Sequence, residues 1–258
     1  MDDLKMIHVQ IVDHIATVTM DNPPVNAQNA ELQDEMIRAF DRISDIDEVR
    51  VAVLTGKGKC FCAGVDIKAR AGAQRRPGDA WRGMRYAREC FHSILECKKP
   101  VIGAINGPAL GAGLGVAASC DILVASESAT LGLPEIDVGL MGGGRHAMRL
   151  FGHSTARRMM LTGYRVSGAE MYRLGVVEAC VPDDKLMETA MGLARQIAAK
   201  SPIASVIAKH ALNTIEEMTL RDGYRFEQNM TVNLQGTEDS KEAMRAFIEK
   251  RKPVFKGR

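Results

Sequence analysis

Short apolar runs of strand length recur along the first half of the chain. They cover residues 49–56 (VRVAVLTG), 101–106 (VIGAIN) and 121–125 (DILVA). Helical patterns lie between them, at residues 81–97 and 110–119. Strands that read as nearly continuous apolar runs are typical of parallel sheets that helices cover on both faces. The sequence therefore predicts an α/β fold with buried parallel strands.

Elements of other kinds are expected at the two ends of this pattern. Alternating apolar residues at 7–11 and an apolar run at 15–20, with Asp13 and His14 between them, predict an N-terminal hairpin. Asn29 is expected to cap a helix. The apolar residues on one face of that helix are Leu32, Met36, Ile37 and Phe40. Beyond Leu150 the pattern is mainly helical, with one short strand in VVEACVP.

Composition and charge exclude few classes of protein. The 258 residues are 46% hydrophobic and 26% charged, as in ordinary soluble domains, and the net charge is +2. No long block of one charge indicates nucleic acid or a membrane surface as a partner. Residues 100–120 carry no charge, but prolines and glycines interrupt them and no Trp or Tyr flanks them, which argues against a membrane span.

The N-terminus and the cysteines favour an intracellular protein. MDDLKMIHVQ has neither a basic leader nor an apolar core, so a cytoplasmic location is expected. The six cysteines include the pair Cys60 and Cys62 but show no metal-binding spacing. We expect reduced thiols within the core.

Two glycine-containing segments could each present a backbone N–H group. In residues 60–68 (CFCAGVDIK), Gly64 permits a conformation that would direct the N–H of Val65 outward, although an ordinary turn is the alternative. In residues 107–121 (GPALGAGLGVAASCD), the first N–H groups of a helix would lack partners inside it. Two such donors meeting at one point would form an oxyanion hole.

The glycine-rich run has three other interpretations. Its glycines could serve tight helix packing alone. A P-loop is excluded because no GxxxxGK[ST] is present, and the dinucleotide fingerprint GxGxxG is broken because Val116 stands where a third Gly or Ala is needed.

A single carboxylate follows in residues 131–144 (LGLPEIDVGLMGGG). Glu135 has apolar neighbours in the sequence, and burial would raise its pKa and make it a better proton acceptor near neutral pH. Those neighbours are Leu131, Leu133, Pro134 and Ile136. A solvated loop carboxylate is the alternative, and Asp137 is the competing candidate base.

Taken together and in this order, these segments resemble the enoyl-CoA hydratase/isomerase (crotonase) superfamily. The resemblance rests on the N-terminal hairpin, the pair Asn26 and Ala27, FCAGVDIK, KPVIGAINGPALGAG, CDILVAS, LPEIDVGL, LGVVEACVP and FIEKRKPVFKGR. It implies a crotonase-like α/β spiral of ββα repeats over residues 1–195 and a helical trimerisation region over residues 196–258. It further implies an acyl-CoA thioester substrate, a homotrimer or dimer of trimers, and no separate cofactor.

The resemblance also implies roles for individual residues. The N–H groups of Val65 and Ala112 would hold the thioester carbonyl, and Glu135 would move a proton. Six further positions would contact the substrate: Ala63, Asp66, Ile67, Lys68, Gly111 and Lys256. Lys256 would approach the nucleotide phosphate bound by a neighbouring subunit.

One position departs from the family's hydratases, which carry a second glutamate twenty residues before the one that matches Glu135. This chain has Gly115 there. Isomerisation needs only one base, whereas hydration divides its work between two. The sequence therefore favours isomerase-type proton transfer slightly, with a hydratase whose first acid/base is replaced, or a non-catalytic acyl-CoA-binding protein, as alternatives. A nicotinamide-dependent dehydrogenase is a remote one.

Other groups could contribute near the acyl site. Arg145 and His146 follow Gly142 to Gly144 and could contact an acyl group, although a surface arginine and a structural histidine are the alternative. An arginine-rich span could border the CoA phosphates, or form a solvated face. Its members are Arg70, Arg75, Arg76, Arg82, Arg85 and Arg88.

Overall fold

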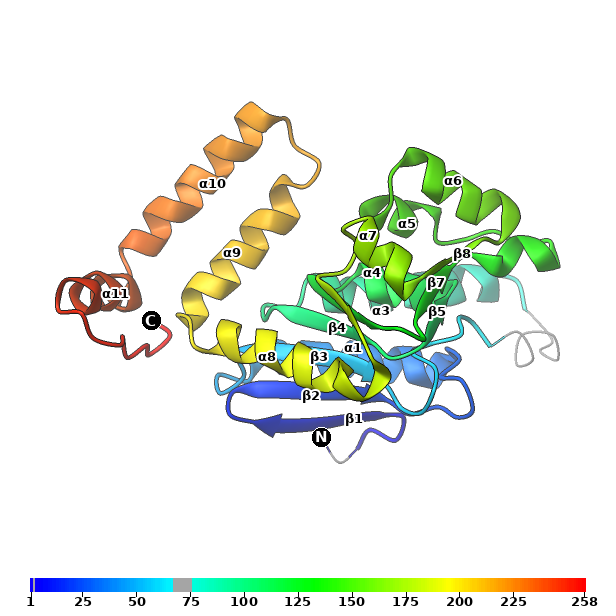
Figure 1. Ribbon diagram of the computed structural model, residues 1–258, viewed down its shortest axis with the longest axis horizontal. Helices are drawn as coiled ribbons and strands as arrows, with labels where there is room; N and C mark the ends of the chain where they lie inside the picture. Colours follow the sequence, from blue (N-terminus) through cyan, green and yellow to red (C-terminus); the bar gives the residue numbers. More distant parts are fainter. Residues whose placement is uncertain (2, 67–75) are drawn as a thin grey trace.

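The computed structural model describes residues 1, 3–66 and 76–258. Its main sheet has the strand order β1-β2-β3-β4-β6-β9 within these residues (Figure 1). The strands are β1 (Ile7–Val12), β2 (Ile15–Met20), β3 (Val51–Gly56), β4 (Val101–Ile105), β6 (Ile122–Ser126) and β9 (Ala179–Val181). The β1–β2 pair is antiparallel and the other pairs are parallel, which confirms both the hairpin and the parallel core.

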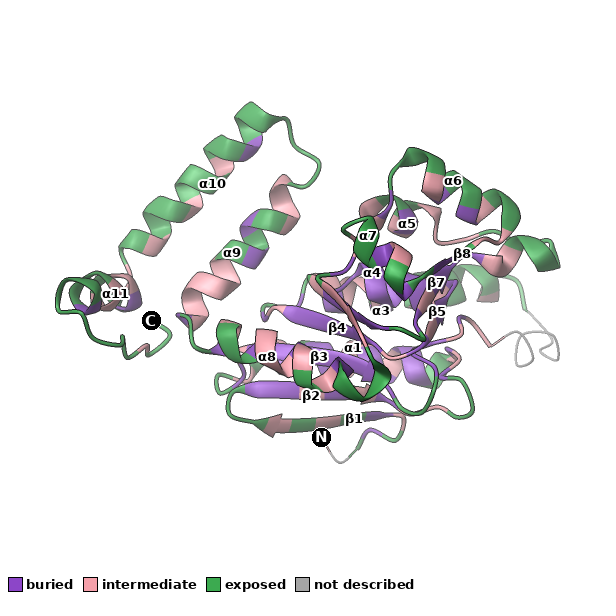
Figure 2. Ribbon diagram, viewed as in Figure 1, coloured by how far each residue is buried: buried purple, intermediate pink, exposed green. Residues whose placement is uncertain are grey.

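Helices cover the main sheet on both faces. One face packs against α1 (Ala30–Asp45), α3 (Asp79–Leu95) and α4 (Ala112–Ala118), and the other packs against α8 (Leu186–Ala198). Successive residues of β3 alternate between the two cores, with Leu54 in the first and Val53 in the second. Every residue of β3 is buried, which explains its nearly continuous apolar sequence (Figure 2).

The start of α1 follows the expected capping pattern. The Asn29 side chain accepts a hydrogen bond from the Leu32 N–H at 2.8 Å. Leu32, Met36 and Phe40 are buried, and Ile37 is partly buried against the same core. The amphipathic pattern therefore predicted this helix and its buried face correctly.

A second, smaller sheet was not predicted. It contains β5 (Pro108–Leu110), β7 (Thr130–Gly132) and β8 (Arg165–Ser167) in the order β5-β7-β8. Each strand has only three residues, too few to show a period of two. Leu110 therefore lies in β5, whereas the sequence pattern placed it at the start of the following helix.

Five short helices lie between residues 134 and 185 of the chain. They are the 3₁₀ helices η1 (Pro134–Val138) and η2 (Asp183–Lys185), and the α-helices α5 (Gly144–Leu150), α6 (His153–Thr162) and α7 (Gly168–Arg173). The half of the chain beyond Leu150 is mainly helical, as expected.

Three helices at the C-terminal end extend away from the main sheet. They are α9 (Pro202–Ile215), α10 (Leu220–Gln235) and α11 (Glu238–Ile248) (Figure 1). A buried lysine ties α9 to the core, because Lys209 Nζ lies 2.8 Å from Asp121 Oδ2 and donates to the carbonyls of Ile94 and Lys99. The predicted boundary between residues 195 and 196 lies in the last turn of α8 and stays a prediction.

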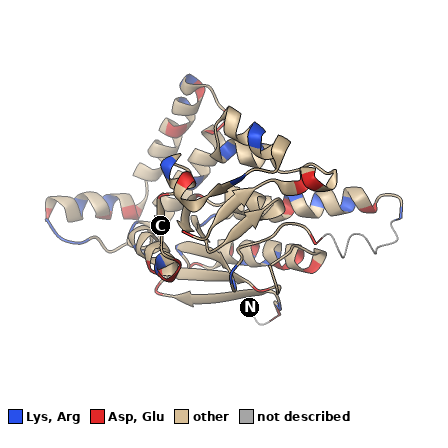
Figure 3. Cartoon of the chain, turned by 45° about the vertical axis from the view of Figure 1, so that its right-hand side comes forward, with Lys and Arg blue, Asp and Glu red and all other residues tan. Residues whose placement is uncertain are grey.

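The distribution of charge and the state of the cysteines are those expected from the sequence. Figure 3 shows the two signs of charge interspersed along the helices. All six cysteines are free, and five of them are buried, as expected. Within the described ranges, no helix is long and apolar enough to cross a bilayer.

Candidate active site

The loop after β3 directs the N–H of Val65 to one side of a short extended segment. The Gln28 N–H donates to the Gly64 carbonyl at 2.7 Å, and the Asp66 N–H donates to the Gln28 carbonyl at 2.9 Å. In such a parallel bridge, the residue between the two bonded neighbours directs its own N–H away from the partner segment. The Val65 N–H therefore points away from Gln28, and it has no hydrogen-bond partner among the described residues.

Ala112 is the first residue of α4, and its N–H lies beside the same loop. β5 ends at Leu110, Gly111 follows with φ 56°, and the helix starts at Ala112. The first N–H groups of a helix have no partner within it. A Cβ placed on Gly64 would lie 3.6 Å from the Ala112 nitrogen, so the residue before Val65 lies against the start of α4. The two segments that carry the predicted donors therefore meet.

Backbone contacts hold these two segments together. The Cys62 N–H donates to the Pro108 carbonyl at 3.1 Å, and the Leu110 N–H donates to the Cys62 carbonyl at 2.9 Å. A Cβ on Gly113 would overlap the Cys62 carbonyl oxygen. Tight packing is therefore one reason for the glycine-rich run, and only glycine fits at this position.

The Glu135 carboxylate lies directly over Gly111. Glu135 belongs to η1, and a Cβ on Gly111 would overlap its Oε1 atom. Its Oε2 atom is buried and has no hydrogen-bond partner within the described part of the chain. Burial raises the pKa of Glu135, and a contact with its own backbone N–H offsets this effect only in part. An unsatisfied carboxylate of this kind costs stability, and such groups cluster at functional sites.

The neighbours of Glu135 differ in part from those that the sequence indicated. Leu131 and Leu133 are buried, but Ile136 is exposed, because the 3₁₀ turn directs it outward. Asp137, the competing candidate, is also exposed and lies toward α6, with Oδ2 3.0 Å from a Cβ placed on Gly163. Glu135 is therefore the carboxylate of this turn that lies beside Gly111.

The region of Gly115 contains a residue that the sequence did not single out. A Cβ on Gly115 would lie 2.9 Å from both Cε1 and Cζ of Phe91, which α3 supplies. The Phe91 ring contacts the His146 ring edge-on, with centroids 4.8 Å apart. No local pattern could have identified Phe91, because α3 and α4 are separated in the chain by β4 and β5.

The basic residues of α5 already have acidic partners. Arg145 forms an ion pair with Glu217, and Arg149 forms one with Glu216 at 2.8 Å. These pairs join α5 to the segment that follows α9, which favours the structural interpretation of Arg145 over a contact with the acyl group. His146 is partly buried, and burial, with nearby cationic groups, lowers its pKa.

The structure describes only some of the other residues that were predicted to contact the substrate. Ala63 and Asp66 border the loop described above, where the Ala63 N–H donates to the Val25 carbonyl at 3.0 Å. Ile67, Lys68, Arg70 and Arg75 lie outside the described residues. The other members of the arginine-rich span are exposed, on α3 or just before it. They are Arg76, Arg82, Arg85 and Arg88.

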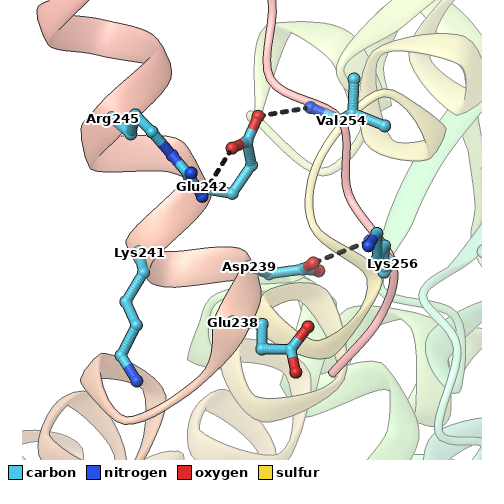
Figure 4. Close-up of a pocket in the computed structure, with 7 residues that line it drawn as sticks. All are labelled: Glu238, Asp239, Lys241, Glu242, Arg245, Val254 and Lys256. Carbon is cyan, nitrogen blue, oxygen red and sulfur yellow. Dashed lines mark hydrogen bonds and ion pairs between the residues drawn. The ribbon is translucent and has the colours of Figure 1, made fainter.

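Lys256 lies beside α11 in the C-terminal tail. Its N–H donates to Asp239 Oδ1 at 2.7 Å, and its side chain lines a pocket of about 340 Å³ between the tail and α11 (Figure 4). Within one chain, the structure therefore places Lys256 in the C-terminal region rather than beside Glu135. In the ranges 3–66 and 76–258, no group of three or more His, Cys, Asp or Glu side chains is arranged to hold a metal ion.

Known proteins similar to this chain point to the same family as the sequence motifs. The family model described as enoyl-CoA hydratase/isomerase matches residues 10–258. A probable enoyl-CoA hydratase from Rhizobium meliloti is 38% identical over 97% of both chains. A (7aS)-7a-methyl-1,5-dioxo-2,3,5,6,7,7a-hexahydro-1H-indene-carboxyl-CoA hydrolase from Mycobacterium tuberculosis is also 38% identical, over 92% of this chain and 95% of the relative.

Solved structures show the same relationship at the level of the fold. The crystal structure of an enoyl-CoA hydratase from Bacillus anthracis matches with a TM-score of 0.93 and 33% identity, covering 98% of this chain and all of the other. The match of the family model over nearly the whole chain confirms the resemblance drawn from the sequence motifs. The chain is therefore an enzyme of the enoyl-CoA hydratase/isomerase (crotonase) family.

Proposed function

We propose that this enzyme moves a proton on an enoyl-CoA, shifting a carbon–carbon double bond, with Glu135 as its single base. The observation that carries the proposal is the position of the Glu135 carboxylate. It lies over Gly111, beside the first N–H of α4, and its buried Oε2 atom has no partner among the described residues. A carboxylate oxygen of this kind is available to take a proton from a bound substrate.

The proposed mechanism divides the work between backbone and side chain. The N–H groups of Val65 and Ala112 donate to the thioester carbonyl oxygen. Glu135 removes a proton from the α carbon of a 3-enoyl thioester, and the electron pair of that C–H bond forms a dienolate whose oxygen takes the negative charge. Glu135 then returns the proton to the γ carbon, which leaves a 2-enoyl thioester. Donors preset for the developing charge are usually the largest catalytic contribution.

Hydration is the second candidate, and the relatives named enoyl-CoA hydratase favour it. Addition of water requires a hydroxyl at the β carbon and a proton at the α carbon, which two polar side chains can share. Gly115 and the phenyl ring of Phe91 supply no such group. We therefore rank isomerisation first.

The two candidate reactions are separated by mass spectrometry of products formed in heavy water. With a short 3-enoyl-CoA, we expect migration of the double bond and incorporation of deuterium. With a 2-enoyl-CoA, we expect exchange without addition of water, because one base can exchange protons and neither Gly115 nor Phe91 offers a polar group to position a water molecule. Addition of water to the 2-enoyl ester would instead assign the chain as a hydratase.

The raised pKa of Glu135 predicts how the reaction depends on pH. The base is active only when ionised, so kcat/KM should fall as the pH decreases through this pKa. Because burial raises the pKa of Glu135, the acid limb should lie above the pH at which an ordinary glutamate titrates. A profile of kcat/KM against pH measures this limb. A limb at the ordinary glutamate value would contradict the assignment of a buried base.

The resemblance to the family also supports a homotrimer or a dimer of trimers built through α9, α10 and α11. These helices carry large apolar side chains that one chain leaves exposed, including Leu212, Leu220, Val232, Phe247 and Ile248. A second copy of the chain would cover them, and it would bring the Lys256 of one subunit near the nucleotide bound by another. The substrate carries its own coenzyme A, so the proposed reaction requires no further cofactor.

A further inference from the structure

The position that lacks a carboxylate is filled by an aromatic ring. A Cβ on Gly115 would lie 2.9 Å from Cε1 and Cζ of Phe91 and 3.3 Å from its Cε2. Contacts below about 3 Å force a displacement of one partner, since packed carbon atoms prefer roughly 3.5–4.0 Å. Any side chain longer than that of glycine at position 115 would therefore overlap the distal edge of the ring.

Packing around Phe91 limits where its ring could move. The ring lies against α4 on one side and contacts the His146 ring on another, with an interplanar angle of 66°. Arg149 holds α5 in place, because it donates to the Ala118 carbonyl at 2.6 Å and pairs with Glu216. Arg149 thus joins the last residue of α4 to α5, the helix that carries His146.

The ring lies one helical turn along α4 from the candidate base. The Gly115 N–H donates to the Gly111 carbonyl at 3.1 Å, and the Glu135 carboxylate lies over Gly111. Carbon atoms of Phe91 therefore occupy the position where a second polar side chain would begin. The group next to position 115 is therefore an apolar ring.

We infer that Phe91 is a specificity-determining residue that excludes a second acid/base group from the site and selects acyl groups able to pack against its ring. This inference rests on the proposed function, in which Glu135 is the single base of an isomerisation. Phe91 itself transfers no proton. Its physical basis is the occupied volume beside Gly115 and the packing that fixes it.

The first test compares three variants: Gly115→Glu, Phe91→Ala, and both changes together. The single Gly115→Glu variant should not add water to a 2-enoyl-CoA, because the ring blocks the new side chain. The double variant should add water at least about tenfold faster than either single variant, since positioned acid/base groups contribute about 10²–10⁴-fold. Equal hydration by Gly115→Glu and the double variant, or no gain in the double variant, would overturn the inference.

The second test measures binding and so does not depend on turnover. Unreactive thioether analogues of acyl-CoA, with either a short linear or a branched acyl group, are titrated by calorimetry into wild type and Phe91→Ala. We expect Phe91→Ala to shift the affinity ratio toward the branched analogue by about tenfold. This shift corresponds to a difference in binding free energy of about 1.4 kcal/mol. An unchanged ratio would overturn the inference.

Two controls separate this result from loss of structure and from failure of the proposed function. Tyr86→Ala truncates another aromatic residue of α3, on its exposed side, and should leave the affinity ratio unchanged. Phe91→Leu is the second variant, for use if Phe91→Ala proves unstable. It keeps an apolar side chain and should retain most of the wild-type affinity ratio. If wild type moves no double bond, the proposed function fails, whereas the affinity ratio still decides the role of Phe91.

Discussion

Replacing Glu135 by glutamine is expected to reduce turnover by about 10²- to 10⁴-fold, the usual contribution of a general acid or base. Glutamine keeps the shape of the side chain over Gly111 but cannot accept the proton. Binding of an unreactive acyl-CoA thioether should survive, because the N–H groups of Val65 and Ala112 are unchanged. Steady-state kinetics and calorimetry measure the two effects separately.

The matched control for this substitution is Asp137→Asn, two residues away in the same 3₁₀ turn. Asp137 is exposed and lies toward Gly163 rather than Gly111, so its loss of charge should leave turnover unchanged. Wild-type turnover in Glu135→Gln would remove Glu135 from the mechanism. A loss in both variants would indicate that the turn, and not one carboxylate, is required.

Glu135→Gln should also raise the thermal stability of the protein near neutral pH. Burial raises the pKa of Glu135 in the folded state, so its protonated form favours folding. That contribution is complete below the pKa of the unfolded chain and is lost as the pH rises through the folded pKa. The ionised form, whose buried Oε2 atom has no partner among the described residues, therefore destabilises the fold, and glutamine removes the charge. Unfolding midpoints at acidic and neutral pH should differ less in the variant than in wild type.

Sequence patterns predicted the elements whose burial leaves a clear local signal. The run around β3 was identified because it is nearly continuously apolar, as burial on both faces requires. The helix α1 was identified because its apolar residues recur with the helical period on one face. β5, β7 and β8 were missed because three residues carry no period. Their pairing depends on the long-range register between Pro108 and Thr130, which no local pattern encodes.

The candidate site was predictable to the extent that local motifs carry it. Glu135 and the two glycine-containing segments were found from motifs, and the structure brings them together. Phe91 was not found, because its contact with Gly115 forms only when α3 packs across α4. The same holds for the acidic partners of Arg145 and Arg149, which lie more than sixty residues away in the chain.

Replacing Ala112 by proline should remove one donor of the proposed oxyanion hole with little change to the fold. Ala112 is the first residue of α4, a position where proline is favoured because its fixed φ suits the helix and its missing N–H has no partner inside it. The preceding Gly111 has no Cβ to clash with the proline ring. We expect turnover to fall by about 10²- to 10³-fold, the effect of losing one preset donor.

Ala112→Ser is the matched control, because it changes the side chain at the same position and keeps the N–H. It should retain turnover close to that of wild type, and thermal unfolding should show that both variants are folded. Free coenzyme A should bind Ala112→Pro as it binds wild type, since the proline ring alters only the acyl end of the site. Full turnover by folded Ala112→Pro would show that the Ala112 N–H does not hold the thioester carbonyl. In that case the first residue of α4 would serve packing alone, as Gly113 does against the Cys62 carbonyl.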